Sequence, residues 1–155
     1  MATREQVLAD YESRLAAGEG VYGFFGKHRP LSNFHLENFV WEGIVWPASE
    51  NAYMASKTDP AHPDPSFSEM SPNVAKKAGQ EVRLVEGWDH LKYSVMLSIL
   101  IAKFRQCPNA REVLLSTDTL YLEETNWWND KTWGRVDGAG DNRLGKALMV
   151  VRDWI

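Results

Sequence analysis

The chain has 155 residues, of which 44% are apolar and 25% are charged, and its formal net charge is −4. This length suits one domain with a hydrophobic core. No dense basic run is present, which disfavours non-specific binding to the nucleic-acid backbone. No window is long and apolar enough to span a bilayer, so no membrane association is expected. The single cysteine, Cys107, excludes an internal disulfide, and a cytoplasmic location is expected.

The first third of the sequence predicts one helix followed by short strands. Residues 3–17 place Val7, Tyr11 and Leu15 on one helical face. This helix, within residues 1–20, is expected to be an extension of a domain that spans residues 21–155. A strand is expected at 21–26 and a loop at 28–34. Two short apolar runs, 39–41 and 44–46, flank Glu42-Gly43 and predict a β-hairpin.

The remaining sequence predicts mostly helices. Pro47 suits the first turn of a helix that is expected to reach about Thr58. A surface loop is expected next, and Asp89 is expected to cap the longest, most apolar helix. The expected segments are the loop 58–72, helices 71–79, 89–104, 108–116 and 143–155, a strand at 120–125 and a loop at 126–142. The sum predicts an α+β fold, a single helix-rich domain with a small, antiparallel sheet.

Two charges in the helix after Pro47 raise the first functional question. Glu50 and Lys57 are seven residues apart, so a continuous helix returns them to within roughly 20° of the same face. They are too far apart for the usual i,i+4 ion pair, but a bound molecule could touch both. By spacing alone, two ordinary solvated helix charges are the simpler interpretation.

The loop 126–142 is the second candidate region. It combines tryptophans, which offer flat faces to a base, with glycines, which allow close backbone approach. It also carries three aspartates. The residues are Trp127, Trp128, Trp133, Asp130, Asp137, Asp141, Gly134, Gly138 and Gly140. A turn-rich connection with tryptophans folded into the core is an equally good interpretation.

An ordered set of motifs resembles a known family. In chain order the motifs are Leu31-Ser32-Asn33-Phe34, Trp46-Pro47-x-Ser49-Glu50 with Lys57, Ala75 to Gly79, Trp88 before a helix ending Ala102-Lys103-Phe104, Leu122-x-Glu124, Asp130-x-x-Trp133-Gly134, and Gly140-x-Asn142-x-Leu144-Gly145. Together they resemble the YbiA-like family, also called NADAR domains, over about residues 22–153. Two positions depart from the family pattern: Asn51 stands where histidine is common, and Ser56 where glutamine is frequent.

The resemblance implies hydrolysis of an N-glycosidic bond without a metal ion or other cofactor. Two substrate classes are associated with the family: phosphorylated riboflavin biosynthesis intermediates, which release ribose 5-phosphate, and ADP-ribose attached to the guanine amino group in nucleic acid. In both, ribose C1 is bonded to an exocyclic amine of a heterocycle. The alternative is a non-catalytic module that binds NAD or ADP-ribose, and either activity is compatible with a toxin–antitoxin or phage-defence context. The resemblance does not decide the oligomeric state.

The resemblance also assigns roles to residues. Glu50 is the expected general acid/base. Lys57 either holds a phosphate or ribose hydroxyl, or forms a Schiff base at ribose C1. Asp130 is expected to orient water or ribose. The expected substrate-binding residues are Asn33 and Asn142, which would bind ribose or phosphate, and Gly134. Trp46, Tyr53 and Trp133 would wall the pocket, and either Trp88 or Trp133 would stack on the base.

Overall fold

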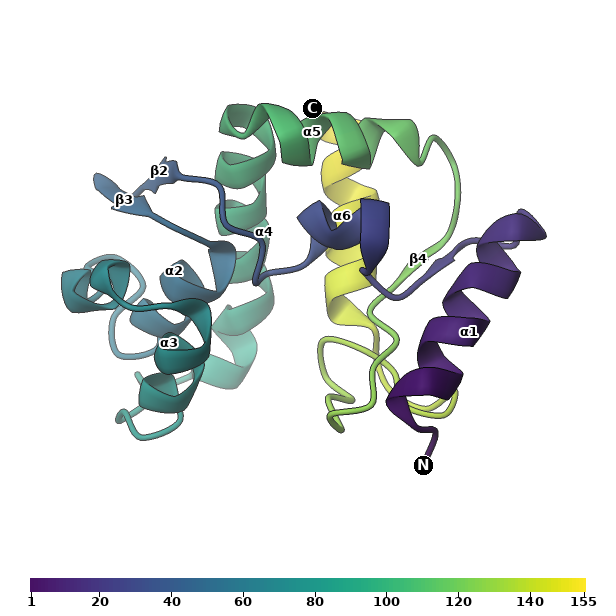
Figure 1. Cartoon of the computed structure of the whole chain (residues 1–155). Helices are drawn as coiled ribbons and strands as arrows, with labels where there is room; N and C mark the ends of the chain where they lie inside the picture. Colours follow the sequence, from purple (N-terminus) through teal and green to yellow (C-terminus); the bar gives the residue numbers. More distant parts are fainter. The chain divides into compact units, whose positions relative to one another are not determined.

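The computed structural model describes all 155 residues and has an α+β fold, as expected. Six α-helices and two short 3-10 helices accompany two sheets of two strands each (Figure 1). The chain divides into two compact units. One, the discontinuous unit, comprises residues 1–32 and 112–154; the other, the continuous unit, comprises residues 33–111 with Ile155.

The discontinuous unit is built on a parallel pair of strands. Val21 pairs with Leu122 in β1 and β4, α1 packs on β1, and α6 packs on β4 (Figure 1). Thr3 begins α1 with a capping box, in which its side chain accepts from the Gln6 amide. The elements are α1 (Arg4–Ala16), β1 (Val21–Tyr22), η1 (Gly26–Leu31), β4 (Leu122–Glu123) and α6 (Arg143–Trp154).

A buried hydrogen-bond pair fastens α1 within the discontinuous unit. The Tyr11 hydroxyl donates to the Phe25 carbonyl at 3.0 Å and lies 2.7 Å from Nδ1 of His28. Burial lowers the pKa of His28, so its ring is neutral at pH 7. Because the hydroxyl proton is already committed to Phe25, Nδ1 of His28 carries the proton and donates to Tyr11.

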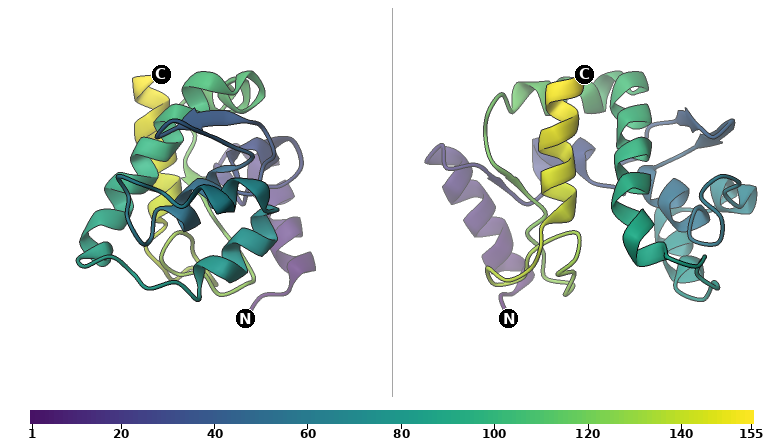
Figure 2. Two further views of the ribbon diagram at one scale, coloured as in Figure 1. Left: turned by 90° about the vertical axis from the view of Figure 1, so that its left-hand side faces the viewer. Right: turned by 180° about the vertical axis from the view of Figure 1, so that it is seen from behind.

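The continuous unit surrounds a short central helix, α2. This helix contacts α3, η2, α4 and β3, and α3 lies alongside it in Figure 1 and again in Figure 2. The elements are β2 (Phe39–Trp41), β3 (Ile44–Trp46), α2 (Ser49–Ala55), η2 (Pro65–Glu69), α3 (Pro72–Gly79) and α4 (Trp88–Gln106). A further helix, α5 (Pro108–Ser116), contains the boundary between the two units, at residues 111 and 112.

The predicted hairpin is confirmed. β2 and β3 pair antiparallel, with Phe39 opposite Trp46. Glu42 and Gly43 have φ values of +51° and +73°, the left-handed geometry of a two-residue hairpin turn. The outer edge of β2 is occupied by a side chain: Gln106 of α4 accepts from the Val40 amide and donates to the Val40 carbonyl, both at 2.7 Å.

Several predicted bounds in the first half of the chain were wrong. The strand expected at 21–26 covers only Val21–Tyr22, because Gly23 and Gly26 adopt positive φ and leave the β region. The loop expected at 28–34 begins as the 3-10 helix η1. The helix expected to reach Thr58 begins at Ser49 and ends at Ala55.

The second half of the chain follows the predictions more closely. Helices α3 and α5, the loop 126–142 and the final helix α6 are confirmed. Within the predicted loop 58–72 lies η2. Helix α4 begins at Trp88 after Gly87, whose φ is +78°, so Asp89 is not the cap. The strand expected at 120–125 is confined to Leu122–Glu123 and is parallel to its partner, whereas the expected sheet was antiparallel. None of the helices combines the length and apolar character needed to cross a membrane.

We predict that Gly145→Ala strongly destabilises the protein. A Cβ atom on Gly145, in the first turn of α6, would overlap the Leu122 carbonyl oxygen of β4 and the Asn142 amide. Since backbone must then move, we expect the free energy of unfolding to fall by about 3 kcal/mol in urea titrations. The neighbouring exposed change Lys146→Ala should alter it by less than about 0.5 kcal/mol. Equal stability of the two variants would contradict this account.

Candidate active site

The first candidate group lies on and around α2. A helix of seven residues is too short to be stable alone, so its position depends on packing, and all seven of its residues are buried. The Glu50 amide donates to the Asn33 carbonyl at 2.9 Å, and the Ser49 hydroxyl donates to Asn33 Oδ1 at 2.8 Å. These bonds join the first two sequence motifs, 31–34 and 46–50, at the N-terminus of α2.

Glu50 and Lys57 interact, but not for the reason that the sequence suggested. The helix ends at Ala55, with Ser56 as its C-cap, so Lys57 lies outside α2 and the same-face argument was wrong. The Glu50 side chain, only 7% exposed, nevertheless acts electrostatically on Lys57. The chain turn after Ala55, rather than helical periodicity, therefore brings the acid and the amine within range of each other.

The Lys57 amine is partly removed from solvent. Its Nζ donates to the Gly79 carbonyl at 3.3 Å and lies 5.9 Å from the centroid of the Tyr53 ring. Burial lowers the pKa of the Lys57 amine from its ordinary value. The negative charge of Glu50 raises this pKa in part, and the positive charge of Lys92 lowers it further. The net direction is downward, which increases the fraction of neutral, nucleophilic amine near pH 7.

Aromatic rings pack beside these charges. The Tyr53 and Trp88 rings are 5.4 Å apart between centroids and tilted by 42°, and each side chain is buried. Trp46 is completely buried, and its indole N–H donates to the Trp41 carbonyl at 2.9 Å. Trp46 is therefore part of the packing beneath α2, whereas Tyr53 and Trp88 adjoin the Lys57 side.

The Asn33 side chain is committed to structure. Its Oδ1 accepts from Ser49, and its Nδ2 lies 3.9 Å from the sulfur of Met96. In this arrangement Asn33 positions the first turn of α2, which carries Glu50. These contacts use one N–H and one acceptor site of the Asn33 carboxamide.

Three residues near this group were not singled out as functional by sequence reasoning. Lys92 is one helical turn beyond Trp88 on α4, is mostly buried and pairs with Asp89 at 3.1 Å. Gly79 brings α3 so close to α2 that a Cβ would overlap Met54, and its carbonyl accepts from Lys57. Asn51 is fully buried and bonds to η2. The available sequence signals were the i,i+4 spacing of Trp88 and Lys92, the motif that ends at Gly79, and Asn51 at a position where histidine is common.

The second candidate group organises the loop 126–142 in the discontinuous unit. Asp130 Oδ1 accepts from the backbone amides of Thr132 and Trp133, at 3.1 and 2.9 Å. Gly134 passes so close to the Glu124 carbonyl that a Cβ would overlap it. One oxygen of Asp130 is thus used to shape the turn that leads into Gly134.

Asn142 ties this loop to β4. It is 2% exposed, and its Nδ2 donates to the Leu122 carbonyl at 3.0 Å while its Oδ1 accepts from the Glu124 amide at 3.0 Å. Asn126, which sequence reasoning missed, is the other organiser: its side-chain amide donates to three backbone carbonyls, including that of Asp130 at 2.9 Å. No spacing in the sequence distinguishes Asn126 from an ordinary loop asparagine.

The predicted site residues therefore form two groups, each within one unit. The group in the continuous unit comprises Asn33, Trp46, Glu50, Tyr53, Lys57 and Trp88. The group in the discontinuous unit comprises Asp130, Trp133, Gly134 and Asn142.

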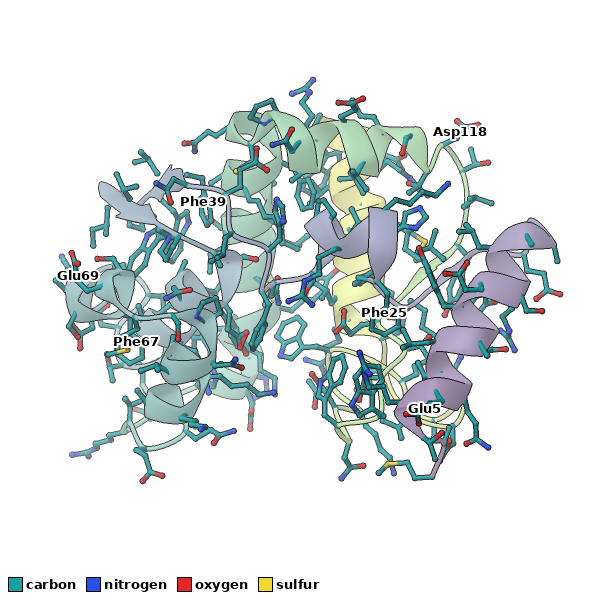
Figure 3. All side chains as sticks on the ribbon, in the orientation of Figure 1. Glu5, Phe25, Phe39, Phe67, Glu69 and Asp118 are labelled. Atoms are coloured by element: carbon teal, nitrogen blue, oxygen red, sulfur yellow. The ribbon has the colours of Figure 1, made fainter.

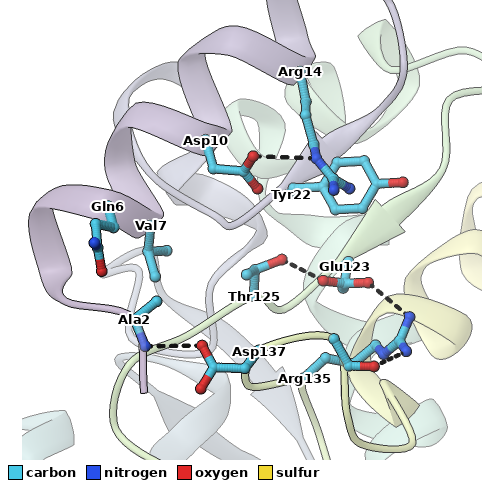
Figure 4. Close-up of a pocket in the computed structure, with 11 residues that line it drawn as sticks. Ala2, Gln6, Val7, Asp10, Arg14, Tyr22, Glu123, Thr125, Arg135 and Asp137 are labelled. Carbon is cyan, nitrogen blue, oxygen red and sulfur yellow. Dashed lines mark hydrogen bonds and ion pairs between the residues drawn. The ribbon is translucent and has the colours of Figure 1, made fainter.

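The discontinuous unit also contains a pocket of about 370 Å³ that the sequence did not predict. Its inner wall is the buried carboxylate of Glu123, which accepts from the Thr125 hydroxyl and from Arg135 (Figure 4). On the α1 side, Arg14 pairs with Asp10 at 3.2 Å and lies 4.1 Å from the centroid of the Tyr22 ring.

Two other kinds of chemistry find no support in the side-chain arrangement. Burial raises the pKa of the Cys107 thiol to about 11, so the thiolate is scarce at pH 7. No three His, Cys, Asp or Glu side chains are grouped so that they could hold a metal ion.

Comparison with known proteins identifies relatives that span most of the chain. The family model described as the NADAR domain matches residues 22–155. The N-glycosidase YbiA of Escherichia coli is 36% identical over 129 residues, which are 81% of this chain and 80% of that protein. An N-glycosidase of Nostoc punctiforme is 31% identical, and the match covers 86% of each chain.

Two further comparisons concern function and fold. A riboflavin biosynthesis protein of Vibrio vulnificus is 34% identical over 136 residues, which are 81% of this chain but 35% of that protein. The NMR structure of E. coli YbiA superposes with a TM-score of 0.73 and 31% identity, covering 85% of this chain and 82% of that chain. The shared fold therefore includes most of both units.

We predict that the Lys57 amine titrates at lower pH than an exposed lysine, and that its charged neighbours tune it in opposite directions. Glu50→Gln removes a charge that raises the pKa of Lys57, so the titration midpoint should fall. Lys92→Met removes a charge that lowers this pKa, so the midpoint should rise. NMR of ¹³C-labelled lysine side chains measures both shifts, with exposed Lys77 as the internal reference. A Lys57 midpoint that follows Lys77 in every variant would contradict the burial argument.

Proposed function

Because the chain belongs to the NADAR domain family, we propose that it hydrolyses the bond between ribose C1 and an exocyclic amine of a heterocycle. Hydrolysis of an N-glycosyl bond is the enzyme class of relatives that are 31–36% identical to it. One observation carries the residue assignment: a buried carboxylate, Glu50, and a half-buried amine, Lys57, interact electrostatically beside packed aromatic rings.

Glu50 is the proposed general acid/base. Cleavage leaves the heterocycle's nitrogen with an electron pair, which needs a proton, and the same group must later take a proton from water. A carboxyl group can do both in turn. The Asn33–Glu50 backbone hydrogen bond holds the first turn of α2 in place, so the carboxyl group approaches the reacting atoms from a fixed position.

Lys57 is the proposed nucleophile. Opening of the ribosyl ring moves the exocyclic nitrogen's electron pair to C1 and protonates the ring oxygen, which leaves a C1=N bond. The neutral Lys57 amine then adds to C1, the heterocyclic amine departs with a proton from Glu50, and a protonated Lys57–C1 imine remains. Water adds to this imine, and loss of the lysine amine releases the sugar aldehyde. The overall change is one water consumed and one C–N bond cleaved.

A phosphorylated riboflavin intermediate is the substrate class that the observations favour. The net charge of −4 offers no broad surface for nucleic acid. The match to a riboflavin biosynthesis protein supports the same class. Lys92, on the α4 turn after Trp88, supplies a positive charge close enough to Lys57 to act on it, which suits the phosphorylated ribose of either candidate substrate. ADP-ribosylated guanine remains the second candidate substrate, since one base needs only a local pocket.

A binding module without activity is the less favoured alternative. Binding of NAD or ADP-ribose requires cations and aromatic rings, but it requires neither a buried acid nor an amine whose pKa is lowered. The roles expected for Asp130, Trp133, Gly134 and Asn142 towards the substrate stay predictions: Asp130 and Gly134 contact the backbone in and beside their loop, and Asn142 bonds to β4.

We expect Glu50→Gln to reduce kcat by about 10²–10⁴-fold, the usual contribution of a general acid/base. The purified protein is given each substrate type, and release of ribose 5-phosphate or ADP-ribose is followed. Glu86→Gln, the same change at an exposed position, should retain full activity. Release of neither product by the unaltered protein would refute the hydrolase proposal, and full activity of Glu50→Gln would refute the residue assignment.

We expect borohydride added during turnover to reduce the Lys57–C1 imine to a stable amine. Mass spectrometry should then find one added sugar on the peptide that contains Lys57. Lys57→Arg should lose both trapping and activity, because guanidinium stays protonated near pH 7, whereas the exposed change Lys77→Arg should keep both. Absence of an adduct, together with an active Lys57→Arg variant, would assign Lys57 a purely electrostatic role.

A further inference from the structure

The residue after Glu50 makes an unusual pair of hydrogen bonds. Asn51 is completely buried, and its Nδ2 donates to the Phe67 carbonyl at 2.9 Å and to the Met70 carbonyl at 2.8 Å. Both acceptors belong to the segment 64–70, which contains η2 and contacts α2 and β3. The Asn51 side chain is thus the donor to the Met70 carbonyl and a second donor to the Phe67 carbonyl, which also accepts from the Met70 amide.

The orientation of the Asn51 amide follows from these acceptors. Carbonyl oxygens only accept, so the nitrogen must face them, and the opposite orientation would place three oxygens against one another. As a result Asn51 Oδ1 is buried without a hydrogen-bond partner. An apolar side chain of similar size would avoid this unpaired acceptor, but it would remove the Asn51 donor from both carbonyls and leave the Phe67 carbonyl with only the Met70 amide, at 3.4 Å.

The segment 64–70 is attached to α2 at a second point. The Asp64 amide donates to the Ala55 carbonyl at the end of α2, at 3.0 Å, and Asp64 Oδ1 caps η2 by accepting from the Ser66 amide. Phe67 is buried, whereas Glu69 projects from the surface of the segment (Figure 3). The backbone of the segment and the Phe67 ring therefore lie against α2, so this part of the predicted surface loop 58–72 is anchored to the helix.

We propose that Asn51 is a positioning residue for the general acid/base. Helix α2 is held at its N-terminus by hydrogen bonds to Asn33 and along its length by packing against α3 and α4. Asn51 adds a directional contact on the side of the helix by binding the segment 64–70. Because Glu50 and Asn51 are consecutive in one helical turn, this bond sets the direction of the Glu50 carboxyl group. The catalytic part of this inference rests on the proposed function.

Activity measurements test the catalytic part. Asn51→Asp keeps the shape but removes both donors, and Asn51→Ala removes the side chain without adding charge. Both variants should lower kcat by about 10²-fold with KM changed less than about threefold, since a small misplacement of a catalytic group acts mainly on the chemical step. The matched control is Asn73→Asp, the same change at an exposed position of α3, which should leave kcat unchanged.

Amide hydrogen exchange tests the structural part without any substrate. In ligand-free protein, exchange at Phe67 and Met70 should accelerate at least about tenfold in both Asn51 variants, and exchange at Leu148 in α6 should not. The Glu50 amide resonance should also shift. Unchanged exchange and unchanged Glu50 resonance would overturn the inference. Faster exchange with normal kcat would leave Asn51 as a structural residue and overturn its positioning role.

The two readouts separate this inference from the proposed function. If the unaltered protein cleaves neither substrate, the proposed function fails, and exchange together with the Glu50 resonance still decides whether Asn51 orients this turn. If the unaltered protein is active and both Asn51 variants are equally active, the proposed function stands and the positioning role fails.

Discussion

The hydrogen bond from the Glu50 amide to the Asn33 carbonyl, 2.9 Å long, is the contact on which the candidate site depends. Its donor is one of the first amides of a helix, which have no partner within the helix itself. No serine, threonine or aspartate cap serves this end, because the N-cap residue is Ala48. A backbone carbonyl from a distant motif takes the place of a capping side chain. The site therefore exists only when residues 31–34 and 46–50 have come together.

In the continuous unit, burial and the charge of Glu50 act in opposite directions on the pKa of Lys57. A carboxyl group and an amine that are both withdrawn from water would each lose solvation, and mutual attraction compensates for part of that loss. At Lys57 burial has the larger effect, and Lys92 adds a repulsion, so the pKa of the amine is lowered although an acid is near. Such a balance is typical of functional sites, where ionisation is tuned rather than maximised.

The sequence predicted the elements well where local rules decide. The left-handed Glu42-Gly43 turn, the Ser71-Pro72 start of α3 and the capped α1 follow from turn and capping chemistry. The sequence-based predictions failed where contacts between distant residues determine the bounds or pairing of an element. The end of α2, which removes Lys57 from the helix, and the parallel partner of β1 are set by packing rather than by nearby residues. The acid and the amine were proposed from ordered motifs and stay predictions. The hydrogen bonds of Asn33, Asn51, Asn126 and Asn142 became apparent only from the structure, since a single asparagine has no diagnostic spacing.

The parallel pairing of β1 with β4 has a consequence for synthesis of the chain. Residues 33–111 are contiguous, so the continuous unit can begin to fold as soon as they leave the ribosome. Val21 of β1 must wait for Leu122, and the face of α1 that carries Val7 and Tyr11 waits for the rest of its own unit. At about 5–20 residues per second, this leaves apolar surface uncovered for several seconds. Slow translation or a stalled ribosome should therefore lengthen the time during which the apolar residues of α1 and β1 are open to chaperones and to aggregation. In the finished protein the same residues are buried.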